Sequence, residues 1–131
     1  MRPLSRLVPL LVTAGLLGCH EVTDPDADPS PLQAGGSFAV GVAVRATPEF
    51  SWASGGANDL NVIRADVGGY IPTEWEVEAT TTAAIRSPVQ YGVRPTGSRL
   101  VGGPRTLVKG ARYRVTIYRA EGRSAYQEFI P

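Results

Sequence analysis

Residues 74–79 read EWEVEA, and large apolar side chains alternate here with glutamates. Successive side chains of a β-strand point to opposite faces of its sheet. A period of two therefore predicts a strand that buries Trp75, Val77 and Ala79 and exposes its glutamates. The stretch predicts a sheet with one buried face and one solvated face.

Six further segments carry strand signals and are separated by turns rich in glycine and proline. They occupy residues 38–44, 50–52, 60–65, 89–93, 112–119 and 125–130. Pro48 follows the first of these segments, and Gly102-Gly103-Pro104 interrupts the chain before residue 112. No amphipathic helix is expected beyond residue 18. Seven short strands predict an all-β fold, a seven-stranded sandwich over residues 37–131.

Residues 107–115 read LVKGARYRV and resemble the corner before strand F in immunoglobulin-like and fibronectin type III domains. The resemblance implies that Leu107 and Tyr113 lie in the core, with Gly110 at the turn. It also implies that the Tyr113 hydroxyl bonds back to the preceding backbone. The segment Phe50-Ser-Trp52 similarly resembles strand B, with Trp52 at the centre of the sandwich. These families imply adhesion, spacing or binding, and no shared activity follows from the fold.

The N-terminal residues have the features of an export signal. Arg2 and Arg6 precede an apolar run over residues 7–17, which as a helix would cover ~16 Å, roughly half of a bilayer's hydrocarbon core. Residues 16–19 read LLGC and resemble a bacterial lipobox. The resemblance implies removal of residues 1–18 by cleavage between Gly18 and Cys19, and a lipid anchor on Cys19. The alternative is an ordinary signal peptide with a stray cysteine.

The lipobox also predicts where the protein resides, which is the bacterial cell envelope. By resemblance to lipoproteins of didermal bacteria, His20 after the cysteine, in place of aspartate, implies the outer membrane if the organism has one. Residues 19–36 are expected to be the lipidated cysteine and a flexible, acidic, proline-rich tether. Asp24, Asp26 and Asp28 resemble the start of an EF-hand loop, but the sixth position holds Pro29 instead of glycine. A calcium site is therefore not expected.

No constellation of residues points to catalysis, so we expect no enzyme activity, cofactor or metal. The single histidine and the single cysteine, His20 and Cys19, both precede the domain, which excludes a histidine-based triad within it. Glu74, Glu76 and Glu78 lie ~6.6–7 Å from one to the next along a strand, a spacing that suits a hydrolase pair. A solvated row that guards against edge pairing is the preferred interpretation. A net charge of +1 argues against nucleic-acid binding.

Alternation within residues 112–119 places Arg112, Arg114 and Tyr118 on the outer side of one strand. Seven basic residues lie between Arg99 and Arg123, so this candidate binding face would suit an anionic glycan or an acidic protein surface. The alternative is that these arginines pair with glutamates across strands, at ~0–1 kcal/mol for each exposed pair.

Two classes of function remain open for a membrane-tethered, non-catalytic lipoprotein. The first is a module that presents its sandwich for protein or glycan binding or adhesion, tethered through Cys19. The second is a structural or assembly accessory subunit of a larger envelope complex. An exposed aromatic residue on a loop would favour the first class, and an uncovered apolar edge strand would favour the second.

Overall fold

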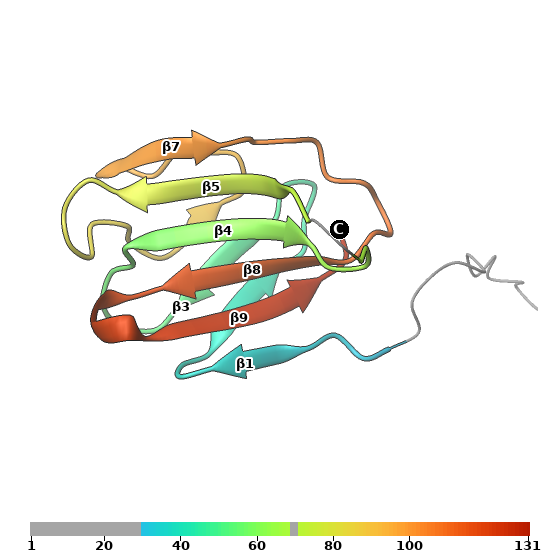
Figure 1. The fold of residues 1–131 in the computed structure, drawn as a ribbon, viewed down its shortest axis with the longest axis horizontal. Coiled ribbons are helices and arrows are strands. Elements are labelled where there is room, and N and C mark those ends of the chain that lie inside the picture. The colour runs from blue at the N-terminus through green and yellow to red at the C-terminus, as the bar shows by residue number, and fades with distance from the viewer. Residues whose placement is uncertain (1–29, 69–70) are drawn as a thin grey trace, which may run out of the picture.

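The computed structural model describes residues 30–68 and 71–131 (Figure 1). The described chain forms nine strands and one short 3₁₀ turn, η1, which lies between the last two strands. The elements are β1 (Ala34–Gly36), β2 (Val40–Ala43), β3 (Glu49–Trp52), β4 (Asp59–Arg64), β5 (Thr73–Ala79), β6 (Val89–Gln90), β7 (Ser98–Gly102), β8 (Tyr113–Tyr118), η1 (Ala120–Gly122) and β9 (Ser124–Phe129).

The strands form two antiparallel sheets that pack as a sandwich. The larger sheet has the order β1-β9-β8-β4-β5-β7, and the smaller one has the order β2-β3-β6. The larger sheet faces the viewer in Figure 1, and β3 crosses behind it. The expected all-β, sandwich-like fold is confirmed.

The expected count of seven strands is wrong, because β1 and β7 add two to the seven segments predicted. The sequence of β1 is AGG, which offers no side-chain pattern to recognise. In β7 the neighbouring residues Leu100 and Val101 are both exposed, and the register with β5 shifts at this point. Alternation is therefore interrupted in β7, and a signal of period two does not reveal it.

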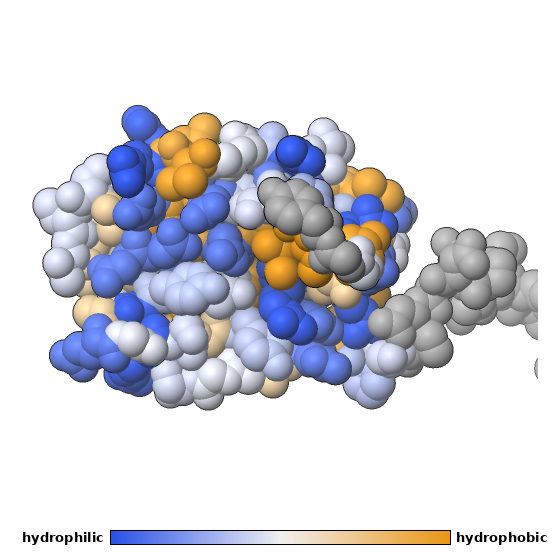
Figure 2. All heavy atoms as spheres, in the orientation of Figure 1, coloured by the Kyte–Doolittle hydropathy of each residue, from blue (hydrophilic) through white to orange (hydrophobic). Residues whose placement is uncertain are grey.

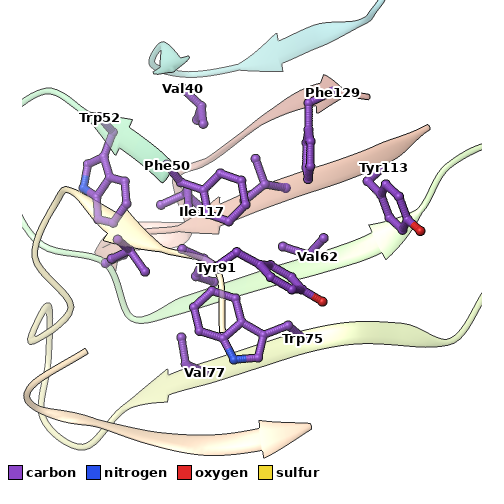
Figure 3. Close-up of a cluster of buried hydrophobic side chains, with 14 of the residues drawn as sticks. Val40, Phe50, Trp52, Val62, Trp75, Val77, Tyr91, Tyr113, Ile117 and Phe129 are labelled. Atoms are coloured by element: carbon purple, nitrogen blue, oxygen red, sulfur yellow. The ribbon is translucent and has the colours of Figure 1, made fainter. Parts of the chain in front are cut away.

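The core lies between the sheets and is rich in aromatic side chains (Figure 3). Trp75 and Val77 of β5 are fully buried, as the alternation of residues 74–79 requires. The Trp75 and Tyr91 rings meet edge to face, with centroids 5.3 Å apart. Phe50 of the smaller sheet meets Phe129 of the larger one at 5.5 Å. Such contacts join the two sheets, and each aromatic pair contributes about 0.5–1.5 kcal/mol beyond the burial of its area.

The corner before β8 has the geometry that the resemblance implies. Tyr113 is buried, and its hydroxyl accepts the backbone N–H of Val108 at 2.8 Å. Gly110 has a φ of +83° in the turn, a left-handed conformation that favours glycine. Leu107 is half-buried and packs against the core.

The described part of the expected tether belongs to the folded domain. Residues 34–36 form β1 and pair with β9, with Gly35 opposite Tyr126 and Gly36 opposite Ala125. Gly36 has a φ of +108°, and a Cβ atom there would lie 2.3 Å from the Ala125 Cα. The domain therefore begins before residue 37, because β1 starts at Ala34, and hydrogen bonds from Arg112 attach Pro31 and Ser30 to it as well.

The lipid-attachment prediction falls on Gly18 and Cys19, which lie outside the described residues. Within residues 30–68 and 71–131, no helix has the length and apolar character needed to span a bilayer.

Candidate functional site

The side of the larger sheet that points away from the smaller sheet is hereafter the outer face. Figure 2 shows this side of the molecule, where a band of hydrophilic residues runs between smaller apolar groups. Its side chains alternate with the core residues of the same strands, as a period of two requires. They are Asp59 and Asn61 of β4, Glu76 and Glu78 of β5, Arg99 of β7, Arg114, Thr116 and Tyr118 of β8, and Tyr126 and Glu128 of β9.

The strand register places four of these residues in one row across the sheet. Tyr118 lies opposite Asp59, which lies opposite Glu78, which in turn lies opposite Arg99. Side chains of directly opposed residues are in contact range, about 4.5–5.5 Å between Cβ atoms. Tyr118 is 42% exposed. An accessible aromatic ring therefore lies next to the Asp59 carboxyl group, in a row that continues to Glu78 and Arg99.

A second row runs beside the first and is also polar. Tyr126 lies opposite Thr116, which lies opposite Asn61, and Asn61 lies opposite Glu76. The Arg114 guanidinium lies 4.4 Å from the centroid of the Tyr126 ring, within the range of a cation–π contact. The two rows together offer hydroxyl, amide and carboxylate groups next to two tyrosines.

The β4–β5 half of the outer face has a negative character. Burial, and after it the charges of Glu76 and Glu78, together raise the pKa of Asp59 to about 6. The Asp59 Oδ1 atom is buried and has no hydrogen-bond partner among the described residues. Glu78 accepts a hydrogen bond from the Arg99 Nε atom at 3.0 Å, in an exposed pair that contributes only about 0–1 kcal/mol.

Arg112 does not lie on an exposed face, and this corrects the predicted binding face. It is 4% exposed, because the N-terminal segment covers it. Its guanidinium donates hydrogen bonds to the carbonyl groups of Ser30 and Pro31 and to the Glu128 carboxylate, the last at 2.9 Å. Residues 112–118 alternate as predicted, but the N-terminal segment covers the Arg112 end of this strand.

Arg114 pairs with the other oxygen of the same carboxylate, at 2.8 Å from its Nη2 atom. Burial alone would raise the pKa of Glu128, but hydrogen bonds from Arg114, the Gln33 N–H and Arg112 outweigh it and hold the pKa below its ordinary value. Glu128 therefore neutralises both arginines in part. Cross-strand pairing, the alternative weighed for these arginines, is what the structure contains. Of the three residues predicted as a binding face, Tyr118 is the most exposed.

Sequence reasoning missed Asp59 and Asn61 as members of the face. The strand was expected to start at residue 60, whereas β4 starts at Asp59. The signal is present, since Asp59 and Asn61 alternate with the buried residues Leu60 and Val62. Asn61 already lay within the expected strand, and extending the alternation by one residue adds Asp59.

The described residues contain no group of three or more histidine, cysteine, aspartate and glutamate side chains that could hold a metal ion. No protein family, curated protein or solved structure matches the chain.

Proposed function

We propose that this chain is a lipid-anchored, non-catalytic protein of the bacterial cell envelope that presents a β-sandwich for binding a protein or a glycan. The anchor rests on the lipobox at residues 16–19, with Cys19 as the lipidated residue. A lipid on Cys19 would hold the domain outside the cytoplasm, in the cell envelope.

The sandwich is proposed to be of the immunoglobulin and fibronectin type III kind. In such folds strands A, B and E share one sheet, while C, F and G share the other, to which some members add a further strand beside C. The order β2-β3-β6 corresponds to A-B-E, and the order β5-β4-β8-β9 corresponds to the added strand followed by C-F-G. Tyr113 at the start of β8 then occupies the position of the corner tyrosine in strand F. On this assignment β1 and β7 are additions at the two edges of the larger sheet.

The observation that carries a binding role is the row of Tyr118, Asp59, Glu78 and Arg99 on the outer face. Tyrosine combines a large apolar surface with a hydroxyl group, and it is enriched where proteins bind ligands. Asp59 beside the ring, with Glu78 and Arg99 farther along the row, offers hydrogen-bonding groups to a polar partner. The row is thus suited to recognise a glycan or a polar protein surface.

Capture from detergent-solubilised envelopes tests this role. Tyr118→Ala is expected to reduce capture by roughly 30-fold, the equivalent of about 2 kcal/mol for a tyrosine at the centre of an interface. Val93→Ala is the matched control, because Val93 is similarly exposed at 54% but lies in the turn after β6. Capture that is equal for wild type and Tyr118→Ala, at equal melting temperatures, would remove the outer face from consideration.

A second function, an accessory subunit of an envelope complex, is favoured by a separate observation. The strand β7 lies at the edge of the larger sheet and exposes 49% of Leu100 and 51% of Val101. Exposed edge strands can pair with a strand of another protein. Val101→Lys places a charge on this edge and should release such a partner, whereas Tyr118→Ala should retain it.

A further inference from the structure

Two arginines meet at the hairpin between β8 and β9, and neither pairs with a carboxylate of residues 30–68 or 71–131. Arg119 directly follows β8, Arg123 directly precedes β9, and the Arg119 N–H donates to the Arg123 carbonyl at 2.7 Å. Every ion pair among the described residues involves other arginines. The hairpin therefore holds two positive charges close together without a countercharge from the folded chain described.

Both guanidinium groups lie against the ring of Phe38, at 5.1 Å for Arg119 and 5.9 Å for Arg123 from its centroid. Arg119 donates one hydrogen bond to the Ala53 carbonyl at 3.4 Å, and Arg123 donates one to the Ser37 carbonyl at 3.5 Å. A guanidinium carries five N–H donors. The ring thus holds both guanidinium groups in place. Most of their N–H donors make no hydrogen bond within the described chain, so they are available to a ligand.

The two arginines line a hollow of about 170 Å³ together with Gly55, Gly56 and Glu121. Gly55 allows this arrangement, because a Cβ atom at that position would lie 2.1 Å from the Arg119 Nη2 atom. Gly56 packs closely against the next loop, where a Cβ atom would lie 1.7 Å from the Ala83 carbonyl oxygen. The backbone under the hollow is therefore fixed by close packing.

We propose that this hollow binds a phosphate group, either as inorganic phosphate or as the phosphate of an ester. The planar fork of a guanidinium matches phosphate oxygens in two parallel hydrogen bonds, and two guanidinium groups balance a doubly charged phosphate. Pockets for drug-sized ligands occupy ~300–1,000 Å³, so a smaller hollow suits a single charged group. The site is distinct from the outer-face rows and lies at the end of the sandwich opposite residue 30, where the described chain begins (Figure 1).

Glu121 also lines the hollow, and its carboxylate opposes an anion. It lies in η1 at the tip of the hairpin, where its backbone φ is +66°, and it is exposed. Removing this charge while keeping the shape, as in Glu121→Gln, should strengthen phosphate binding. This opposite effect distinguishes a phosphate site from a general loss of structure.

The test uses the full chain in a non-ionic detergent, titrated with inorganic phosphate at constant ionic strength against chloride. The readout is the NMR shift of the arginine Nε–H groups and of the Gly55 and Gly56 amides. We expect saturable shifts in the wild type, at least tenfold weaker binding in Arg123→Gln, and tighter binding in Glu121→Gln. Arg94→Gln is the control, since Arg94 is exposed in the turn after β6. Absence of saturation, or equal weakening by Arg94→Gln, overturns the proposal.

Two soluble esters identify the source of the phosphate. Glycerol phosphate represents a free monoester, and glycerophosphoglycerol represents the deacylated headgroup of an anionic phospholipid. Tighter binding of the monoester supports a soluble or polymeric phosphate ester as the ligand. Tighter binding of the diester supports a lipid headgroup. If neither ester nor inorganic phosphate shows binding that Arg123→Gln weakens, the hollow is not a phosphate site.

Discussion

Glu128→Ala should be among the most damaging substitutions in this domain. The carboxylate of Glu128 is 5% exposed and accepts hydrogen bonds from Arg112 at 2.9 Å, Arg114 at 2.8 Å and the Gln33 N–H at 3.1 Å. Alanine removes the Glu128 carboxylate from its contact with the buried Arg112 guanidinium. Removing one partner of a buried ion pair typically costs about 3–5 kcal/mol. With a urea dependence of about 1.5 kcal/mol per M, the unfolding midpoint should fall by about 2–3 M.

Urea unfolding followed by circular dichroism measures this change, and Glu78→Ala is the control. Glu78 pairs with Arg99, but both side chains are exposed, at 43% and 67%, so its loss should cost about 0–1 kcal/mol. If both substitutions lowered the free energy of unfolding by the same small amount, burial of the Glu128 ion pair would not make it more important for stability than the exposed pair.

The dependence of folding stability on pH tests the role of the Glu128 carboxylate independently. The pKa of Glu128 is held below its ordinary value of 4.5 in the folded chain, so its stabilising effect is present above that pH and is lost as pH falls through the folded pKa. The wild type should therefore lose stability on acidification from pH 5 to pH 3. The Glu128→Ala variant should lack this part of the loss.

The remaining predictions concern the corner, the first strand and the outer face. Tyr113→Ala should destabilise the domain by about 3–5 kcal/mol in chemical unfolding, and a change below about 0.5 kcal/mol would place Tyr113 outside the core. Gly36→Ala should detach β1 and accelerate amide exchange at Glu128, whose N–H donates to the Gln33 carbonyl at 2.8 Å; an unchanged exchange rate would contradict this. Asp59→Asn should raise the melting temperature at pH 7, because ionising a carboxyl group whose pKa is raised to about 6 opposes folding. The gain should vanish below pH 3.8, and an equal gain at both pH values would contradict the assigned cause.

The sequence was sufficient where one strand face is buried and the other is solvated. Trp75 and Val77 alternate with glutamates, and their burial follows from that pattern alone. The corner at Tyr113 was recognisable because its turn glycine and tyrosine keep a fixed spacing. Both patterns lie within a short stretch of sequence, so they can be recognised without knowing which strands are neighbours in the fold.

Features that depend on distant segments could not be read in the same way. Alternation along the strand points Arg112 away from the core, so an exposed side chain was predicted. Ser30 and Pro31, some eighty positions earlier in the chain, cover it. The strand β1 likewise depends on the close approach of Gly36 to Ala125. Neither contact produces a periodic pattern in the sequence. The predicted binding face therefore wrongly included Arg112.

The hollow beside Arg119 was missed for a related reason. It joins residues from the loops after β3 and β5 to the β8–β9 hairpin. Each loop by itself reads as an ordinary turn, and glycine pairs such as Gly55-Gly56 are common in turns. Only the sandwich brings these loops to one end of the molecule.

The lipid proposed on Cys19 would hold this sandwich at a membrane, and metabolic labelling tests that anchor most directly. Cells that express the wild type or Cys19→Ser are grown with a palmitate analogue, and each protein is purified and assayed for incorporated label. We predict label in the wild type and none in Cys19→Ser, because the substituted side chain has no thiol to form the thioether. Equal labelling of the two proteins, or no label in the wild type, would contradict the claim.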